Sequence, residues 1–475
     1  MVVYIVGAGP GDLELITIKA KGLIENAEVI LYDKLVNKEI LNWALPDCEF
    51  IYVGKREKDS KTSQSIQKDI NSLIQKYGKS KRVVRLKGGD PLIFGRGGEE
   101  AQICARNKIP FEIIPGISSA IAAPAYAGIP VSHRDFNSSF AILTGHESDK
   151  DDSAIDWKHL PETLIILMGV KKIKETALKL LDLGRDPSTP VAAVYRGTTI
   201  KQKTVITSLE KLAKGDFSLT PPIVFIVGSI VTLHKELNWY ERKLNTISGK
   251  NIVLTRAKTH LKESKELIES YGMKVISMPL IELIFKDFKS YNLDRFDAII
   301  FTSVEGVKRV KEKLDLKDFK GKFFAIGPKT KNKLKELGLN ASIGKSYNSN
   351  GLAEHIINNL SNGSKILAFR SSAASDVLKN KLADKYEIME EYVYDIKRLP
   401  ADPEKIKKGD AVFVVSASCA KSIAELEPSI LKEKTLVSIG PETSKNLPIP
   451  HIAASEFTIQ GMINVYFDYL WQESK

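Results

Sequence analysis

A glycine-rich turn follows an apolar β-type run in the segment YIVGAGPGD, near the start of the sequence. Gly7 and Gly9 match the first and third glycines of the fingerprint that binds dinucleotide phosphates, but the sixth place is Asp12. A carboxylate there repels phosphate, and Pro10 removes one of the amide donors that such a loop needs. We therefore expect Asp12 to cap a helix that begins near Leu13, in a turn that either binds a ligand without phosphates or is purely structural.

Other residues suited to binding or catalysis follow expected strands in the first half. Gly88, Gly89 and Asp90 end the run VVRLKGGD, where bare backbone and a carboxylate could hold the hydroxyls and amine of a nucleoside. Asp33 closes the run EVILYD about 20 residues beyond the first loop, where a dinucleotide enzyme keeps its ribose-binding acid. Lys55 follows the run FIYVG. Each charged residue, taken alone, also fits an ordinary charge at a strand end.

The second half of the chain repeats three short motifs at a nearly constant separation. The matched positions are Arg256 with Arg370, Ser303 with Ser416, and Gly327 with Gly440. Each motif places an arginine, a hydroxyl or a Gly-Pro turn where a strand passes into a helix, so amides and hydroxyls can converge on acidic groups of a ligand. Such residues also cap helices without binding anything. The shared order of the motifs favours two similar lobes around a cleft.

The elements that must position these residues alternate along almost the whole chain. Short β-type runs such as RVVRLK, TLIILM, IVFIVG and AVFVVS are separated by amphipathic helical segments, which indicates an α/β fold with mainly parallel sheets. Sites in such sheets lie at the carboxyl ends of the strands. A length of 475 residues exceeds what one core normally supports, and we place the main domain boundary near Ser248, where polarity rises.

Composition argues against several classes of protein. The three cysteines lack a CxxC pair and the seven histidines form no HxxH or HxxxH pair, so we expect neither disulfides nor a metal. The best apolar stretch, PPIVFIVGSIVTL, is too short to span a bilayer, and no signal peptide is expected, which suits a cytoplasmic protein. The formal charge of +12 could attract a nucleic acid, but the sequence contains no recognised nucleic-acid-binding module. A small polyanionic substrate would be attracted by the same positive potential.

The first half resembles a known family in a series of long motifs. VGAGPGD, YDKLV, VGKR, RVVRLKGGDPLIFGRGGEE, PGISSA, GIPVSHRD, TGH, LMG, RGTT and VGSIVTLHKELNW are similar to the tetrapyrrole methylases, and specifically to uroporphyrinogen-III C-methyltransferases. The resemblance covers residues 1–245 and implies two lobes, about 1–116 and 117–245, with S-adenosylmethionine bound between them and no metal. The cofactor-binding residues that it implies are Pro10, Gly88, Gly89, Asp90, Ile93, Ser118, Ser119, Met168 and Gly197.

The resemblance also implies roles in a reaction. Asp33 would accept a proton and Lys55 would donate one, while uroporphyrinogen III receives two methyl groups and becomes precorrin-2. Because this substrate is rich in carboxylates, Arg85, Arg96 and Arg134 are candidate anchors for it. The family is typically dimeric, so the resemblance implies a homodimer through this half. The expected partners are small tetrapyrroles, not nucleic acids or membranes.

The second half, residues 249–475, resembles uroporphyrinogen-III synthase in the motifs LTRA, FTSVEGV, AIGPKT, RSS, EEYVYDIKR, VVSAS and SIGPET. The resemblance implies one lobe from about 249–283 plus 397–475 and another from about 284–396, joined by two strands. Hydroxymethylbilane would be cyclised with inversion of ring D. Tyr394 matches a tyrosine that assists departure of the hydroxyl, although it also fits an amphipathic connector. The implied substrate-binding residues are Arg256, Thr302, Ser303, Gly327, Arg370, Ser416, Ser418, Gly440 and Thr443.

The two implied activities are consecutive, so we favour a bifunctional enzyme, a lyase joined to a methyltransferase, in sirohaem or cobalamin biosynthesis. Three alternatives stay open. An NAD-dependent oxidoreductase would use the first loop and Asp33 for its cofactor, and a nucleic-acid-binding protein would use the basic charge. A methylase acting on a later corrin intermediate is the nearest competitor, because it would share the same cofactor and lobes.

Overall fold

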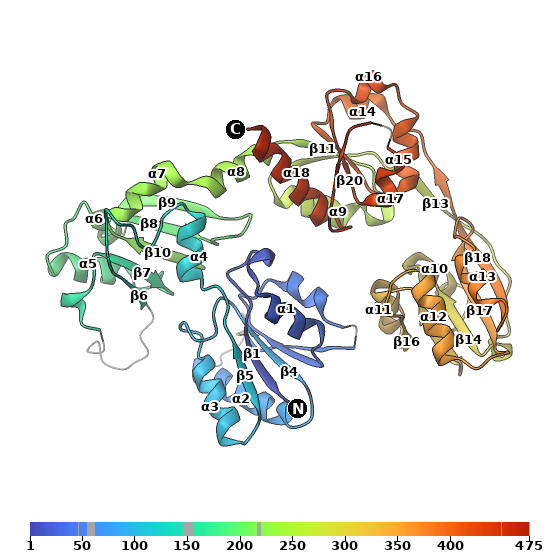
Figure 1. Ribbon diagram of the computed structural model, residues 1–475, viewed down its shortest axis with the longest axis horizontal. Helices are drawn as coiled ribbons and strands as arrows, with labels where there is room; N and C mark the ends of the chain where they lie inside the picture. The colour runs from blue at the N-terminus through green and yellow to red at the C-terminus, as the bar shows by residue number, and fades with distance from the viewer. Residues whose placement is uncertain (46, 55–61, 146–154, 216–219, 448, 475) are drawn as a thin grey trace. The chain divides into compact units, whose positions relative to one another are not determined.

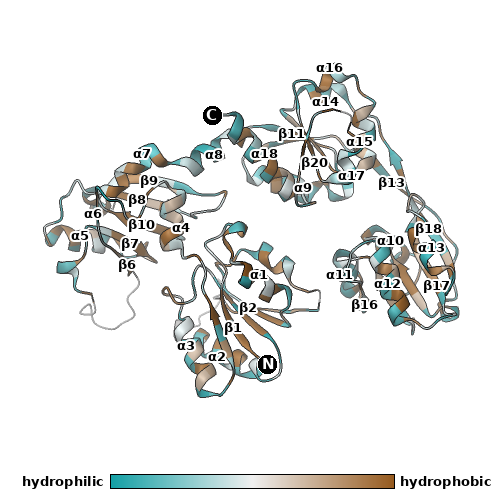
Figure 2. Cartoon of the chain, in the orientation of Figure 1, coloured by the Kyte–Doolittle hydropathy of each residue, from teal (hydrophilic) through white to brown (hydrophobic). Residues whose placement is uncertain are grey.

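The chain divides into two compact units, Met1–Thr246 and Ile247–Lys475. Each unit contains two sheets with helices packed against them (Figure 1), which confirms the α/β fold class. Figure 2 shows apolar strands in brown within each sheet, and these strands pack against helices to form the buried core. The computed structural model describes residues 1–45, 47–54, 62–145, 155–215, 220–447 and 449–474.

The first sheet pairs its strands in parallel, in the order β3-β2-β4-β1-β5. Because parallel strands end at one edge, the loops that follow β1, β2 and β4 meet there. The strands are β1 (Val3–Gly7), β2 (Val29–Tyr32), β3 (Glu49–Tyr52), β4 (Val83–Lys87) and β5 (Phe111–Ile114). The helical elements are η1 (Leu13–Leu15), α1 (Ile18–Glu25), η2 (Lys38–Trp43), α2 (Ser63–Gly78) and α3 (Gly97–Arg106).

The central strand β4 places two cations inside the first lobe. Val84 and Leu86 pack in the core that includes α1, whereas Val83 packs in the core that includes α2 and α3. Side chains alternate along a strand, so Arg85 and Lys87 point to the same side as Val83. Every residue of β4 is buried. The two cations therefore lie in the interior, on the α2 and α3 side of the sheet.

The second sheet, in the order β6-β7-β10-β8-β9, departs from the expected parallel arrangement. β6 and β7 are parallel, but β10 runs antiparallel to both β7 and β8, and β8 runs antiparallel to β9. The link between β8 and β9, residues 196–202, is shorter than the dozen or so residues that a parallel crossover needs, so these strands form a hairpin. The strands are β6 (Phe140–Thr144), β7 (Thr163–Leu167), β8 (Pro190–Tyr195), β9 (Lys203–Ser208) and β10 (Ile223–Val227). The helical elements are α4 (Ser119–Tyr126), η4 (Trp157–His159), α5 (Ile173–Asp182), α6 (Leu209–Lys214), η5 (Ser229–Leu233), α7 (His234–Leu237) and α8 (Trp239–Ile247).

One sheet of the second unit is built from both ends of that unit. Its order is β12-β11-β19-β20-β21 and its pairs are parallel, so β11 from the start of the unit lies beside β19 from its last third. The strands are β11 (Asn251–Leu254), β12 (Lys274–Ser277), β19 (Ala411–Val414), β20 (Thr435–Ser438) and β21 (Ile452–Ala453). The helical elements are η6 (Lys258–His260), α9 (Leu261–Ser270), α14 (Pro403–Lys407), α15 (Ala417–Ala424), α16 (Pro428–Leu431), α17 (Pro441–Ser444) and α18 (Ile459–Glu473).

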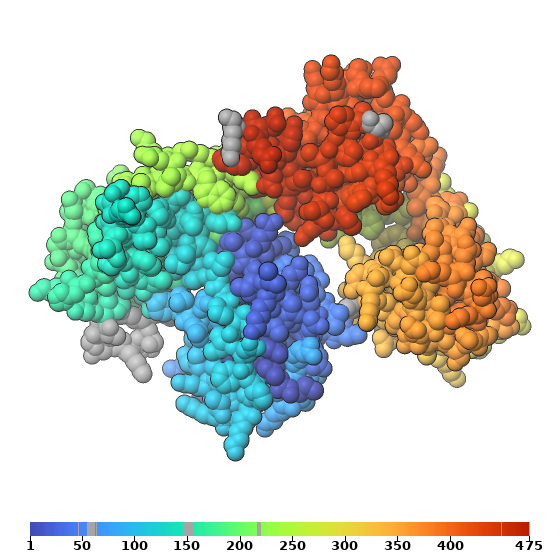
Figure 3. All heavy atoms as spheres, in the orientation of Figure 1, coloured from blue at the N-terminus to red at the C-terminus, as the bar shows by residue number. Residues whose placement is uncertain are grey.

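The other sheet of this unit, β13-β18-β17-β14-β15-β16, comes from its middle, which Figure 3 shows gathered in one yellow-to-orange body. Its pairs are parallel except that of β13 with the second half of the long strand β18. The strands are β13 (Ile281–Phe285), β14 (Ala298–Phe301), β15 (Lys322–Ala325), β16 (Ala341–Ser342), β17 (Lys365–Ser371) and β18 (Glu387–Arg398). The helical elements are η7 (Leu293–Arg295), α10 (Val304–Lys311), α11 (Pro328–Glu336), α12 (Ser349–Asn359) and α13 (Val377–Leu382). In the described part of the chain, no helix has both the length and the apolar character needed to cross a membrane.

Candidate active sites

Three strand ends of the first sheet meet at the glycine-rich loop. Gly9 N donates to Gly89 O at 3.3 Å, and Gly89 N donates to Gly9 O at 2.7 Å. A Cβ atom on Gly116 would lie only 2.3 Å from Gly89 O and 2.8 Å from Gly7 Cα. Gly9 and Gly89 also have positive φ angles of 74° and 69°. Glycine is required at these places, and the loops after β1, β4 and β5 form a surface of bare backbone.

Asp90 and the start of α4 border this backbone surface. Asp90 Oδ2 accepts a hydrogen bond from Gly116 N at 3.0 Å, so the carboxylate ties the loop after β4 to the loop after β5. Ser118 caps α4, since its Oγ atom accepts from the amide two residues along the chain. A Cβ atom on Gly89 would lie 3.7 Å from Ser119 N. The structure thus brings Gly89, Asp90, Ser118 and Ser119 together.

Asp12 joins the first loop to the second lobe. Its Oδ1 atom accepts from the amide two residues on and caps η1, which confirms the expected capping role. Its amide donates to Thr198 Oγ1 at 3.2 Å, and its Oδ2 atom accepts from Tyr126 OH at 2.8 Å. Burial and the Asp12 carboxylate raise the pKa of Tyr126, so this hydroxyl stays a donor. With these bonds, Asp12 is held by protein groups of both lobes, and its carboxylate disfavours a phosphate in this loop.

The remaining residues implied for the cofactor lie in loops of both lobes. Pro10 is in the first loop, and the exposed Ile93 is in the loop after β4. Gly197 follows β8, where a Cβ atom would lie 2.4 Å from Ala123 Cβ of α4. Met168 directly follows β7, with a φ angle of 55° and a side chain that is 52% exposed. An exposed apolar side chain on a left-handed backbone is uncommon and favours a ligand contact.

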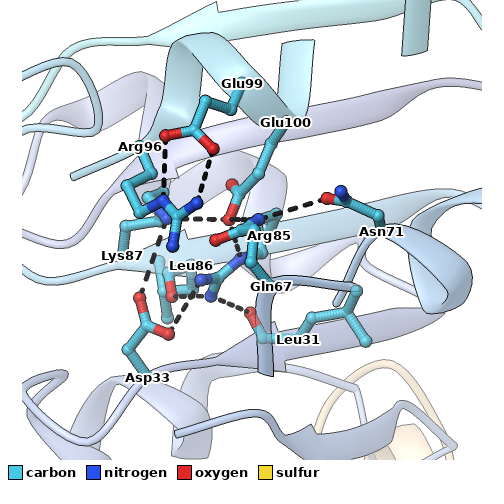
Figure 4. A network of polar contacts seen from close by, with 10 residues as sticks. All are labelled: Leu31, Asp33, Gln67, Asn71, Arg85, Leu86, Lys87, Arg96, Glu99 and Glu100. Carbon is cyan, nitrogen blue, oxygen red and sulfur yellow. Dashed lines mark hydrogen bonds and ion pairs between the residues drawn. The ribbon is translucent and has the colours of Figure 1, made fainter. Parts of the chain in front are cut away.

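Asp33 lies at the end of β2, beside the two cations of β4 (Figure 4). Arg85 Nη2 donates to Asp33 Oδ1 at 2.8 Å, and Lys87 Nζ lies 3.9 Å from Asp33 Oδ2. Behind them, Glu100 Oε1 accepts from Arg85 Nε at 3.1 Å and from Lys87 Nζ at 2.9 Å. The Asp33 side chain is 29% exposed, whereas that of Glu100 is 0% exposed. A chain of alternating charges therefore runs from the edge of the sheet into the interior.

The four charges of this network balance one another. Burial lowers the pKa of Lys87, and the Arg85 cation lowers it further, while the two carboxylates oppose that change. Removing one partner of a buried pair leaves an uncompensated charge, which is costly. Arg85, Lys87 and Glu100 are buried, so Asp33 is the member of this network that a ligand can reach.

A cavity of about 590 Å³ lies in the second unit. Arg256 after β11, Ser303 at the start of α10 and Tyr394 of β18 line it. The Ser303 hydroxyl hydrogen-bonds to Tyr394, and burial raises the pKa of the Tyr394 phenol despite this bond. Arg256 Nε is buried and has no hydrogen-bond partner among the described residues. Further cations at the wall are Lys308, Lys329 and Lys333, and the carboxylates there are Glu263 and Glu305, of which Glu305 pairs with Lys308 at 2.8 Å. The cations outnumber the carboxylates, so an anionic ligand fits this lining.

Comparisons with known proteins place each half of the chain in a family. Residues 2–213 match the family described as tetrapyrrole (corrin/porphyrin) methylases, and residues 262–464 match uroporphyrinogen-III synthase HemD. The porphyrin biosynthesis protein HemD of Ruminiclostridium josui is 32% identical over 97% of both chains. The chain belongs to both families. It is a bifunctional enzyme of tetrapyrrole biosynthesis, with a methylase unit (Met1–Thr246) and a synthase unit (Ile247–Lys475).

Two further similarities concern the methylase unit. The uroporphyrinogen-III C-methyltransferase of Bacillus subtilis strain 168 is 51% identical over 51% of this chain and 95% of its own length. The native crystal structure of uroporphyrin III C-methyl transferase from Thermus thermophilus is 39% identical and covers 49% of this chain and 100% of its own, with a TM-score of 0.43.

The structure corrects the expected role of Arg85 in the methylase unit. Arg85 is 1% exposed, and its guanidinium bonds to Asp33, Glu100 and backbone oxygens, so it is not an anchor for substrate carboxylates. Arg96 is partly exposed and forms a two-bond pair with Glu99, at 2.9 and 2.6 Å. Arg134 is exposed. These two arginines stay candidates for substrate binding. Lys55 lies outside the described residues.

Arg370 of the synthase unit is a second correction. It is 1% exposed, pairs with Glu390 and donates to Ser375 O at 2.7 Å, so it holds β17 and β18 together instead of reaching a ligand. Its repeat partner, Arg256, does line the cavity. Thus the motif is duplicated, but its two arginines have different tasks.

The other repeat positions begin helices. Ser303 Oγ accepts from Gly306 N at 3.0 Å, and Ser416 Oγ accepts from Cys419 N at 3.2 Å, so the two serines cap α10 and α15 in the same way. Gly327 and Gly440 begin α11 and α17. Of the substrate-binding residues expected in this unit, Arg256 and Ser303 line the cavity. The positions outside its lining are Thr302, Gly327, Arg370, Ser416, Ser418, Gly440 and the buried Thr443.

Sequence reasoning missed Lys87 and Glu100. A signal was available, because Arg85 and Lys87 stand two apart in the otherwise apolar run VVRLK, which places two cations on one face of a buried strand. Nothing in the sequence showed that Glu100 of α3, not its neighbour Glu99, turns inward to meet them. Among the described residues, no group of three or more His, Cys, Asp or Glu side chains is arranged to hold a metal ion.

Proposed function

We propose that the synthase unit cyclises hydroxymethylbilane to uroporphyrinogen III with inversion of ring D. The methylase unit then transfers two methyl groups from S-adenosylmethionine to that product, giving precorrin-2. The observation that carries the proposal is the alignment of the whole chain with a single relative whose name assigns it to porphyrin biosynthesis, with both families represented in order. We assign methyl transfer to residues 1–245 and cyclisation to residues 249–475.

The first loop fits S-adenosylmethionine better than a dinucleotide. Bare backbone at Gly89, where an added Cβ atom would meet only the Ser118 and Ser119 backbone at 3.8 and 3.7 Å, leaves room for a close ligand. The Asp12 carboxylate disfavours phosphate without disfavouring a sulfonium cation. When bound, S-adenosylmethionine supplies an electrophilic methyl group. The residues that would hold it are Pro10, Gly88, Gly89, Asp90, Ile93, Ser118, Ser119, Met168 and Gly197. Their task is to fix the approach of the substrate carbon, because alignment supplies much of the rate of such a transfer.

Asp33 is the proton acceptor that the structure supports best. Methylation of a pyrrole carbon leaves a cationic ring, which regains its neutral form by losing a proton. Asp33 Oδ1 is bonded to Arg85, so Oδ2 is the oxygen open to that proton. Lys55 is still the proposed proton donor, because it lies in the motif VGKR that resembles the methylase family. Arg96 and Arg134 are the proposed carboxylate anchors.

In the synthase unit, the proposed proton donor to the departing hydroxyl is Tyr394, which lines the cavity. Burial raises the pKa of its phenol above the ordinary value, so the phenol stays protonated further into the alkaline range. Arg256 and the lysines of α10 and α11 supply positive charge for the carboxylates of the bilane. The cavity also limits the conformations of a flexible ligand, which favours ring closure.

One experiment tests the complete proposal. The full chain is given hydroxymethylbilane and S-adenosylmethionine under anaerobic conditions, and the product is weighed by mass spectrometry. We expect a cyclised tetrapyrrole that has gained two methyl groups. A cyclised product without methyl groups, together with methylation of a later corrin substrate, would favour the later methylase instead. A dimer through the methylase unit is also proposed, and light scattering of the purified chain tests it.

A further inference from the structure

Glu100 is a buried carboxylate near the proposed active site, and the mechanism proposed above gives it no role. It lies in the first turn of α3 and is 0% exposed, yet it contacts no ligand-facing residue directly. Its Oε1 atom accepts from Arg85 Nε and Lys87 Nζ, and Gln67 Nε2 of α2 lies 3.5 Å away. Figure 4 shows Glu100 on the far side of these two cations from Asp33. Glu100 therefore acts on Asp33 through Arg85 and Lys87.

The bonds of Arg85 leave one of its nitrogens for Asp33. Nε donates to Glu100, and Nη1 points at two backbone oxygens, those of Leu31 at 3.4 Å and Leu86 at 3.2 Å. Only Nη2 is left to reach Asp33, and it donates to Oδ1 at 2.8 Å. Arg85 thus makes a single bond to Asp33, although arginine commonly grips a carboxylate with two.

Lys87 is held back from Asp33 in the same way. Its Nζ atom lies 2.9 Å from Glu100 Oε1 and 3.9 Å from Asp33 Oδ2, beyond hydrogen-bond distance. Asp33 Oδ2 therefore accepts no hydrogen bond from any residue that the structure describes. A carboxylate oxygen without a donor keeps its affinity for a proton, whereas one gripped by two cations loses it.

We propose that Glu100 is a positioning residue for proton transfer at Asp33. By holding Arg85 and Lys87 on its own carboxylate, it fixes the orientation of Asp33 through Oδ1 and keeps Oδ2 free to accept the proton that leaves the methylated substrate. The inference rests on the proposed methyl transfer in the methylase unit. Among the residues that the structure describes, the charged groups that face Asp33 are Arg85 and Lys87 of β4, with Glu100 of α3 behind them, while Gln67 and Asn71 of α2 are uncharged.

The test compares Glu100→Gln, Glu100→Asp and Lys87→Met with the unaltered full chain. In Glu100→Gln the two cations are released onto Asp33, so kcat for methyl transfer falls about 10- to 100-fold while KM for S-adenosylmethionine is unchanged. The acid limb of the pH–rate profile moves to lower pH, because Asp33 loses a neighbouring negative charge and gains cationic partners. Lys87→Met moves that limb to higher pH. Glu100→Asp restores charge and recovers part of kcat.

If Glu100 had a purely structural role, Glu100→Gln and Lys87→Met would both lower kcat. The acid limbs of their pH–rate profiles would not move in opposite directions. The matched control is Glu112→Gln, since Glu112 also lies in the first lobe but pairs with Lys19 at the surface. If Glu100→Gln fails to fold, Glu100→Asp takes its place: its shorter side chain holds the two cations less firmly, so its acid limb should also move to lower pH, opposite to that of Lys87→Met. Unchanged kcat in a folded Glu100 variant, or limbs that move together, overturns the positioning role alone. Absence of methyl transfer by the unaltered chain overturns the proposed function, and the positioning role with it.

Discussion

Gly116 and Gly7 touch backbone to backbone, since a Cβ atom on Gly116 would lie 2.8 Å from Gly7 Cα. This contact closes the loops after β1 and β5 against each other, at the surface that we assign to S-adenosylmethionine. The loop after β4 takes part as well, because the same Cβ atom would lie 2.3 Å from Gly89 O. The site is therefore formed by backbone shape more than by side chains, and its glycines can be tested directly.

Gly116→Ala is expected to displace the Gly7 and Gly89 backbone and to destabilise the methylase unit by about 1–3 kcal/mol. Calorimetry should show that the binding free energy of S-adenosylhomocysteine weakens by at least as much as the free energy of unfolding falls. Gly22→Ala is the control, because Gly22 is in helix α1 with nothing within 4 Å of an added Cβ atom. That change should be neutral or stabilising, by up to about 1 kcal/mol. Equal binding by the two variants would contradict the assignment of this surface.

Asp33→Asn should lower kcat for methyl transfer by about 10²- to 10⁴-fold, because an amide cannot accept the substrate proton. Steady-state assays with uroporphyrinogen III measure the rate, and calorimetry should show unchanged binding of S-adenosylhomocysteine. Asp182→Asn, at the exposed end of α5, is the control and should retain full activity. A folded Asp33→Asn variant with ordinary turnover would remove Asp33 from the mechanism.

Tyr394→Phe should slow the cyclisation of hydroxymethylbilane by about 10²-fold, because the proton donor to the departing hydroxyl is lost. Burial raises the pKa of Tyr394, so the rate of the unaltered chain should not fall on the alkaline side until the pH exceeds the usual tyrosine value of about 10. Tyr392→Phe, at an exposed position of the same strand, is the control. Loss of rate already near pH 8 would point to another donor.

The fusion itself can be tested with two full-length variants. A mixture of Asp33→Asn and Tyr394→Phe chains contains one working methylase unit and one working synthase unit, but on separate molecules. The mixture and the unaltered chain are compared at equal concentrations of working units. If fusion raises the local supply of uroporphyrinogen III, the mixture should show a longer lag before dimethylated product forms when the protein concentration is low. Identical time courses would show that the shared chain gives no such advantage.

The sequence was sufficient for features that depend on local backbone chemistry. Asp12 could be predicted as a helix cap because a carboxylate and a proline make a phosphate loop unfavourable, and the structure places it so. The meeting of Gly9 and Gly89 at one sheet edge followed from the parallel strands β1 and β4. The antiparallel β8–β9 hairpin was missed, since the apolar pattern of a buried strand does not reveal its direction.

The roles of charged residues were harder to predict. Arg85 and Arg370 were expected at ligand surfaces, yet both are buried against carboxylates from other elements, Glu100 on α3 and Glu390 on β18. Those partners are set by how helices and strands pack, which no local spacing encodes. Arg256 met the expectation of a place in the cavity because it lies past the end of its strand, not within it.

The synthase unit begins α10 and α15 at the equivalent serines, Ser303 and Ser416, but of the two only Ser303 lines the cavity. Tyr394 adds to this difference between the lobes, because the connector strand β18 brings its phenol to the cavity lining while the partner connector β13 reads IELIF and carries no phenol. The binding surface that we propose is therefore asymmetric, so the two ends of a long ligand would meet different chemical groups in it.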